Sequence, residues 1–140
     1  MVYVDTSALV PAFIREPKSA AILAWIESSG ERLAISEWSV TEFASAAAIK
    51  VRTGQVTAPL AKRAWTRFLD FAEKHCLIAV PNRAEFRRAA DLAGDPSRNL
   101  RAGDAIHLAI AEALQAKGVL TFDGGMSESV KALGLNAVTI

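Results

Sequence analysis

Short apolar runs alternate along the chain with longer segments in which apolar residues recur at helical spacing. This alternation predicts an α/β fold with a parallel sheet covered by helices. The predicted strands are 2–4, 33–35, 77–80, 119–122 and an edge strand at 137–140. The predicted helices begin at about Ser7 and Pro17 and then span about 40–51, 58–74, 84–93, 102–116 and 127–133.

Two acidic residues follow predicted strands directly. Asp5 ends the run 2–4, and Asp123 ends the run 119–122. Ligand clefts of open α/β sheets form at the carboxyl ends of the strands, which is where both acids are expected. Two more acids, Glu42 and Asp104, lie near the starts of apolar helices.

Each acid also has an ordinary structural explanation. Asp5 is a good helix cap, and Glu42 is placed for a capping box with Ser39. Asp104 is favoured by the dipole of its helix, and Asp123 before two glycines suits a turn. The joint placement of all four acids at strand ends and helix starts favours a shared site over four separate structural roles.

A cluster of carboxylates suits Mg²⁺ or Mn²⁺, because these hard cations prefer oxygen ligands. The chemistry that fits is hydrolysis of a phosphodiester by a metal-activated water. Thr6, Ser7 and Thr121 are placed to hydrogen-bond a ligand carboxylate, although capping and strand propensity explain them equally well. His107, three residues after Asp104, is expected to be a partly buried histidine with one hydrogen bond rather than a metal ligand.

Composition narrows the functional class. The 140 residues are 51% apolar, which suits one domain over residues 1–140. No stretch is long and apolar enough for a bilayer, and the one cysteine, Cys76, suits a reducing cytoplasm. The net charge of +1 gives no support for a strong basic nucleic-acid binder. The helical basic clusters, Lys62-Arg63 with Arg67 and Arg83 with Arg87-Arg88, are expected to be mainly solvated faces.

Four segments together resemble the motifs of the PIN-domain family. They are Val-Tyr-Val-Asp-Thr-Ser-Ala-Leu at 2–9, Ser-Val-Thr-Glu-Phe around Glu42, Leu-Arg-Ala-Gly-Asp-Ala-Ile-His-Leu-Ala at 100–109, and Val-Leu-Thr-Phe-Asp at 119–123. The resemblance covers nearly the whole chain, and its length is similar to that of VapC toxins from toxin–antitoxin pairs. It implies a three-layer α/β/α sandwich with a five-stranded parallel sheet.

The resemblance also implies an activity and partners. It implies an Mg²⁺- or Mn²⁺-dependent endoribonuclease acting on RNA such as tRNA or rRNA, with Asp5, Glu42, Asp104 and Asp123 as catalytic, metal-binding acids. It implies a homodimer, held inactive by a VapB-type antitoxin. The size and spacing of the tryptophans, and not the resemblance, make Trp25, Trp38 and Trp65 candidate contact residues for the dimer or the antitoxin. This chain departs from the family in two places. Two glycines follow Asp123, where some members supply a further acid or polar group, and Pro11 stands in the first helix where a charged or polar residue is common.

Two other functions compete with this one. The first is a catalytically silent PIN-fold module that binds RNA or protein, against which the four intact acids argue. The second is a phosphatase of the haloacid dehalogenase kind with Asp5 as nucleophile. Such enzymes place a second aspartate two residues later, where this chain has Ser7. The sequence lacks a P-loop, a dinucleotide-binding glycine pattern and a serine-nucleophile elbow.

Overall fold

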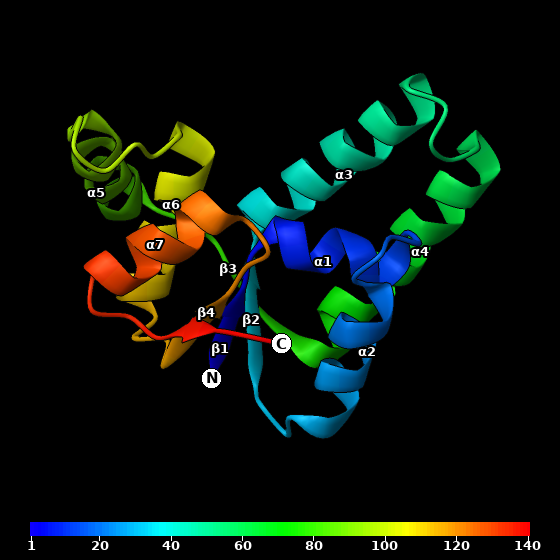
Figure 1. Cartoon of the computed structure of the whole chain (residues 1–140), viewed down its shortest axis with the longest axis horizontal. Coiled ribbons are helices and arrows are strands. Elements are labelled where there is room, and N and C mark those ends of the chain that lie inside the picture. The colour runs from blue at the N-terminus through cyan, green and yellow to red at the C-terminus, as the bar shows by residue number, and fades with distance from the viewer.

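The computed structural model describes residues 1–140 as five strands and seven helices (Figure 1). The strands are β1 (Val2–Val4), β2 (Leu33–Ser36), β3 (Cys76–Ala79), β4 (Gly118–Leu120) and β5 (Ala137–Val138). The helices are α1 (Thr6–Phe13), α2 (Ser19–Ser28), α3 (Glu37–Arg52), α4 (Ala58–His75), α5 (Arg83–Gly94), α6 (Ala102–Ala113) and α7 (Gly124–Ala132). No helix is both long and apolar enough to cross a membrane.

All strand pairs are parallel, and the order across the sheet is β3-β2-β1-β4-β5. The predicted five-stranded parallel sheet is therefore confirmed, with the last strand at an edge. The central strand β1 pairs with β4 so that Val4 lies beside Leu120. Because β1 and β4 run in the same direction, the residues that follow both strands meet at one edge of the sheet.

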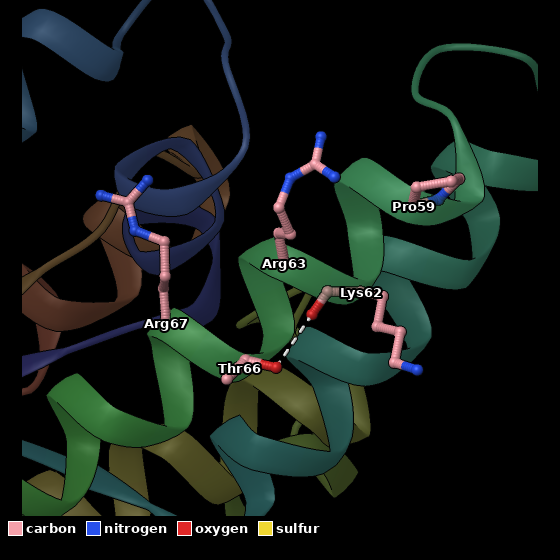
Figure 2. Close-up of a pocket in the computed structure, with 5 residues that line it drawn as sticks. All are labelled: Pro59, Lys62, Arg63, Thr66 and Arg67. Atoms are coloured by element: carbon pink, nitrogen blue, oxygen red, sulfur yellow. Dashed lines mark hydrogen bonds between the residues drawn. The ribbon is translucent and has the colours of Figure 1, made fainter.

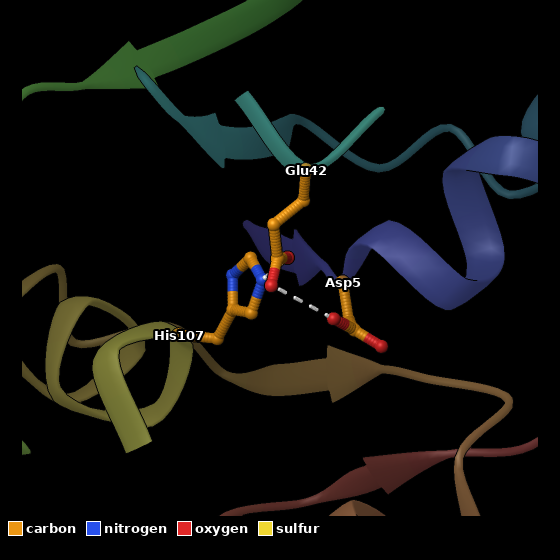
Figure 3. A group of neighbouring side chains, drawn as sticks. All are labelled: Asp5, Glu42 and His107. Carbon is orange, nitrogen blue, oxygen red and sulfur yellow. Dashed lines mark hydrogen bonds and ion pairs between the residues drawn. The ribbon is translucent and has the colours of Figure 1, made fainter. Parts of the chain in front are cut away.

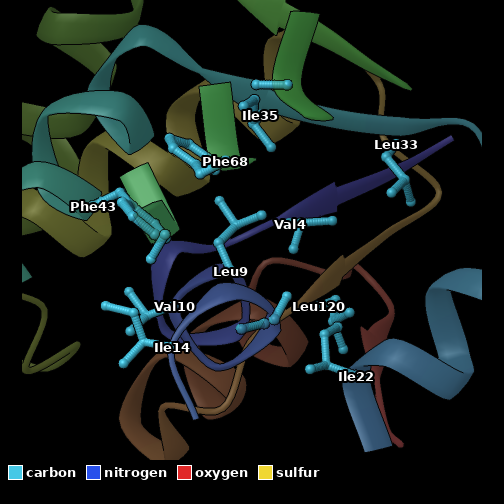
Figure 4. Packing of buried hydrophobic residues seen from close by; sticks show 14 of the residues in the cluster. Val4, Leu9, Val10, Ile14, Ile22, Leu33, Ile35, Phe43, Phe68 and Leu120 are labelled. Carbon is cyan, nitrogen blue, oxygen red and sulfur yellow. The ribbon is translucent and has the colours of Figure 1, made fainter. Parts of the chain in front are cut away.

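The two faces of the sheet are covered by different helices. Alternate residues of a strand point to opposite faces, so Val2 and Val4 join one core while Tyr3 joins the other. The first core lies beneath helices α1 to α4 and holds Phe43 stacked on Phe68, with ring centroids 4.2 Å apart (Figure 4). This burial on both faces explains why β1 is apolar throughout.

The second core lies between the sheet and helices α5 to α7. Helix α6 supplies more of it than any other element, since every residue from Ala105 to Ala111 is buried. The two cores make three layers, α/β/α, as the sequence resemblance implied. In Figure 1, α3 and α4 form a helical pair that extends beyond the sheet.

Several element boundaries differ from the sequence prediction for local reasons. Helix α3 begins three residues early because Ser36 and Ser39 form a capping box. Strand β4 ends at Leu120, so Asp123 follows it by three residues instead of ending it. Helix α2 begins after Pro17, at Ser19. Helix α6 stops at Ala113, and the chain turns through Gln115 with a φ of 50°.

Candidate active site

The four acids predicted from the sequence line one open hollow at the carboxyl edge of the sheet. They come from the junction after β1, from α3, from the start of α6 and from the start of α7. The residues that line the hollow are Asp5, Thr6, Ser7, Glu42, Ser45, Ala46, Ile49, Asp104 and Asp123. Segments from both halves of the chain are thus brought together at a single place.

Asp5 is buried, with 4% of its surface exposed, and its two oxygens have different surroundings. Oδ2 accepts hydrogen bonds from the Ser7 amide at 3.2 Å, the Ser7 hydroxyl at 2.5 Å and the Thr121 hydroxyl at 2.8 Å. Asp5 is also the cap of α1, so its structural and site roles coexist, and neither Thr6 nor Ser7 is the cap. Three donors fix Oδ2, whereas Oδ1 lies 3.4 Å from His107 Nε2.

Glu42 has the same division between its oxygens. Oε2 accepts from the Thr6 hydroxyl at 2.8 Å and lies 2.5 Å from His107 Nε2. Burial by itself raises the pKa of Glu42, but hydrogen bonds from His107 and Thr6 and the nearby imidazole outweigh burial and hold the pKa below its ordinary value. The predicted capping box between Glu42 and Ser39 is wrong, because Ser36 is the partner of Ser39.

The imidazole of His107 points toward these two carboxylates (Figure 3). It is 1% exposed, and its ring uses both nitrogens: Nδ1 is 2.8 Å from the Tyr3 hydroxyl, and Nε2 contacts Glu42. The expectation of a partly buried histidine with one hydrogen bond is therefore wrong. Nε2 is also 3.4 Å from Asp5 Oδ1, and one ligand atom from each of Asp5, Glu42 and His107 lies within 4.8 Å of the others.

Asp104 and Asp123 line the same hollow but stand outside this tight group. Burial, followed by repulsion from Asp5 and Asp123, raises the pKa of Asp104 above its ordinary value. Asp123 caps α7, with Oδ1 accepting from the Met126 amide at 2.8 Å. Repulsion from Asp5 and Asp123 thus adds to the larger effect of burial on the pKa of Asp104.

No arginine or lysine neutralises this charge. Arg101 forms no ion pair with Asp104, and Arg98 pairs instead with Asp95 at 3.1 Å. The residues present therefore fit a divalent cation, because the carboxylates of Asp5, Glu42, Asp104 and Asp123 line one hollow and supply the hard oxygen ligands that such an ion prefers. Such a cation would offset the repulsion that raises the pKa of Asp104.

Two residues of the site escaped the sequence analysis. A Cβ added to Gly103 would lie 2.9 Å from Glu42 Oε1, so only glycine lets this carboxylate approach α6 so closely. Trp38 Nε1 lies near the same point and has no hydrogen-bond partner. The Gly-Asp pair at the start of α6 was the available signal, but sequence alone does not show which side chain faces the glycine.

A second hollow is basic and lies on α4. It is lined by Pro59, Lys62, Arg63, Thr66 and Arg67, whose side chains share one face of the helix (Figure 2). Neither Arg63 nor Arg67 nor Lys62 takes part in an ion pair, unlike Lys74 further along α4, which pairs with Asp70. The three charges of this basic hollow are therefore available to an anionic partner.

The three tryptophans are partly buried, and their role as contact residues stays a prediction. Trp25 and Trp65 pack against the first core, and Trp38 packs against the second. Cys76 is the first residue after α4, and burial raises the pKa of its thiol to about 12.

Comparison with known proteins identifies the family. The PIN domain family model matches residues 2–131. No curated protein has a matching sequence. Among solved structures, the sarcin–ricin-loop-cleaving toxin VapC20 of Mycobacterium tuberculosis has 16% identity and a TM-score of 0.77, with all of both chains covered.

Two further structures share the fold. PAE2754 of Pyrobaculum aerophilum has 23% identity and a TM-score of 0.69, covering 98% of this chain and 87% of that one. VapBC2 of Rickettsia felis, solved with a DNA fragment from their promoter, has 15% identity and a TM-score of 0.66, covering 99% and 98%. These likenesses concern the fold, whereas the family model spans nearly the whole sequence, and the chain belongs to the PIN-domain family.

Proposed function

We propose that this chain is an Mg²⁺- or Mn²⁺-dependent endoribonuclease that acts as the toxin of a type II toxin–antitoxin pair. The observation that carries the proposal is the convergence of Asp5, Glu42, Asp104 and Asp123 on one hollow in which no lysine or arginine pairs with them and only the imidazole of His107 contacts Asp5 and Glu42. Membership of the PIN-domain family and the fold shared with VapC20 support the same activity.

The chain's own residues would prepare the site in three ways. Ser7 and Thr121 orient Asp5, and Thr6 and His107 orient Glu42, so that both carboxylates would be held in place to bind the cation. Asp104 and Asp123 complete the negative hollow. A bound divalent ion lowers the pKa of a coordinated water and stabilises the charge that develops on the phosphate.

RNA with exposed loops or single strands is the proposed substrate. The hollow is open to solvent and lies at the edge of the sheet, and a loop presents its phosphodiester more freely than a duplex does. The four carboxylates repel a phosphate in the absence of the cation, so RNA and metal are expected to bind together. The basic hollow of Lys62, Arg63 and Arg67 is the proposed contact for phosphates away from the cleaved bond.

The decisive experiment is RNA cleavage by the purified chain with Mg²⁺, with Mn²⁺ and with EDTA, beside Asp104→Asn. Cleavage that needs metal and disappears in a folded variant supports the nuclease. Binding of metal and RNA without any cleavage of a total-RNA pool would replace it with the silent binding module. Trapping of a phosphorylated Asp5 would instead indicate a phosphatase of the haloacid dehalogenase kind.

The proposed partners are a VapB-type antitoxin and a second copy of the chain. The fold shared with the VapBC2 complex supports the first of these. Light scattering of the purified chain at micromolar concentration tests the homodimer, for which a monomeric mass is the contrary result. Co-purification with the product of a neighbouring small gene, followed by loss of cleavage in the complex, tests the antitoxin.

A further inference from the structure

A chain of buried polar side chains runs beneath the acidic hollow. The Tyr3 hydroxyl donates to Ser36 Oγ at 3.0 Å and lies 2.8 Å from His107 Nδ1. The other ring nitrogen, His107 Nε2, lies 2.5 Å from Glu42 Oε2. These contacts join the first strand, the end of β2, helix α6 and helix α3 in one line that ends at a site carboxylate.

Burial of this line of polar side chains costs more free energy than packing alone would require. Tyr3 and Ser36 are fully buried and His107 is 1% exposed, in a layer otherwise filled by aliphatic side chains. A buried polar group costs free energy unless it is hydrogen-bonded, and an apolar residue at the same place carries no such demand. Every polar side chain in the line is hydrogen-bonded, so the line transmits a defined orientation from Ser36 to Glu42.

The end of the line fixes one oxygen of Glu42. His107 Nε2 and the Thr6 hydroxyl both contact Oε2, so the carboxylate of Glu42 is held in one orientation at the hollow. A free glutamate side chain has several rotamers, and their loss on binding weakens affinity. A carboxylate that is already held in one orientation avoids this loss.

Direct ligation by His107 fits the distances less well. An ion about 2.1 Å from each of two ligand atoms holds them roughly 3 Å apart at a right angle. His107 Nε2 is 2.5 Å from Glu42 Oε2, which is a hydrogen-bond distance with no room for an ion shared by these two atoms.

We propose that His107, oriented by Tyr3 and Ser36, is a positioning residue that sets Glu42 for the divalent cation. This inference rests on the proposed function, since it concerns the same cation. Tyr3 acts on the Glu42 carboxylate only through His107, and it would contact neither the cation nor the RNA. The line is thus part of the machinery of the site although no member except Glu42 lines the hollow.

The test is a double-mutant cycle on Mn²⁺ affinity, measured by calorimetry with the full chain and no RNA. Tyr3→Phe keeps the ring and removes the hydroxyl, and it is expected to weaken Mn²⁺ binding by about 10-fold. In a Glu42→Gln background the same change is expected to cause no further loss, because the group that Tyr3 positions is already gone. In an Asp123→Asn background the full loss is expected to remain.

The cycle separates positioning from general loosening of the structure. An equal loss in both backgrounds, or unchanged affinity in a folded Tyr3→Phe protein, would overturn the inference while leaving the nuclease proposal intact. A wild-type chain that binds no Mn²⁺ would overturn the proposed function and the inference with it. Circular dichroism of each variant verifies that the measured protein is folded.

Two substitutions of His107 give an independent comparison. Gln places an amide NH₂ near the position of Nε2, whereas Asn places it near Nδ1. If His107 acts by donating to Glu42, His107→Gln is expected to retain most of the Mn²⁺ affinity and His107→Asn to lose about 10-fold. Equal and large losses in both variants would overturn positioning in favour of direct ligation by the imidazole.

Discussion

Glu42 Oε1 lies against the backbone of Gly103, so close that a Cβ at residue 103 would be 2.9 Å away. Gly103→Ala is therefore expected to displace the carboxylate from the hollow. The expected result is a loss of Mn²⁺ affinity of at least about 10-fold, comparable to the loss of an outer-shell contact in a metal site. Calorimetric titration of the full chain measures it.

Gly124 supplies the matched control for this substitution. It lies in the first turn of α7 beside Asp123, and a Cβ there would meet nothing within 4 Å. Gly124→Ala is expected to leave the Mn²⁺ affinity within about two-fold of wild type, since an unhindered surface substitution changes little. Equal affinities of the two alanine variants would show that the contact between Gly103 and Glu42 has no importance for the cation.

Asp104→Asn is expected to reduce RNA cleavage by at least about 100-fold, because it removes one charge from the cation site. The amide has nearly the shape of the carboxylate, so the circular dichroism spectrum is expected to stay the same. Initial cleavage rates in saturating Mn²⁺ measure the effect. Wild-type rates in the folded variant would remove Asp104 from the site.

The same variant is expected to be more stable than wild type without metal. The folded-state pKa of Asp104 is raised, so the stability present with a protonated carboxyl is lost as the pH rises through that pKa. Asparagine stays neutral and avoids this loss. Thermal unfolding in EDTA is expected to show equal stabilities well below about pH 4 and a variant more stable by a few degrees near neutrality.

Added Mn²⁺ is expected to reverse that order. A ligand that binds only the folded protein stabilises it, and wild type binds the cation more tightly than the variant does. The expected result is a wild-type melting temperature above that of Asp104→Asn in Mn²⁺ and below it in EDTA. One set of melting curves would then show both the stabilisation by the cation and the destabilisation by the charge of Asp104. An unchanged order in the two buffers contradicts the link between repulsion and cation binding.

The basic hollow on α4 is expected to contribute to RNA affinity and not to chemistry. Arg63→Glu and Arg67→Glu are each expected to raise KM several-fold with little change in kcat, and to reduce the slope of log affinity against log salt by about one. Lys74→Glu on the same helix is the control, because Lys74 pairs with Asp70 and stands outside the hollow. Indistinguishable KM values for the three variants would remove this surface from RNA binding.

The sheet and the gathering of the four acids were predictable because strong local patterns encode them. The apolar run before Asp5 is a central strand in the structure, and β1 is buried on both faces as such a run requires. The acids gather because parallel strands deliver their following residues to one edge of the sheet. The expectation that Thr6, Ser7 and Thr121 hydrogen-bond the carboxylates also agrees with the structure.

The part that was not predictable depends on contacts between distant segments. Tyr3 reads as one more apolar strand residue, and only the packing of α6 on the sheet places its hydroxyl beside His107. The acid nearest to His107 in sequence is Asp104, on the same helix. The acid that His107 contacts is instead Glu42, 65 residues away. Helical spacing shows which residues share a face but not what that face meets.

The place of β1 in the middle of the sheet has a consequence for the timing of activity. This strand is made first, but its neighbour β4 begins only at Gly118, and Thr121 and Asp123 follow it. While a ribosome is still making the chain, Asp5 lacks Thr121 and Glu42 lacks His107. Under the proposed function, a partly made chain is therefore expected not to cleave nearby RNA until Thr121 and Asp123 have been added, and translation that stops before them is expected to yield an inactive product.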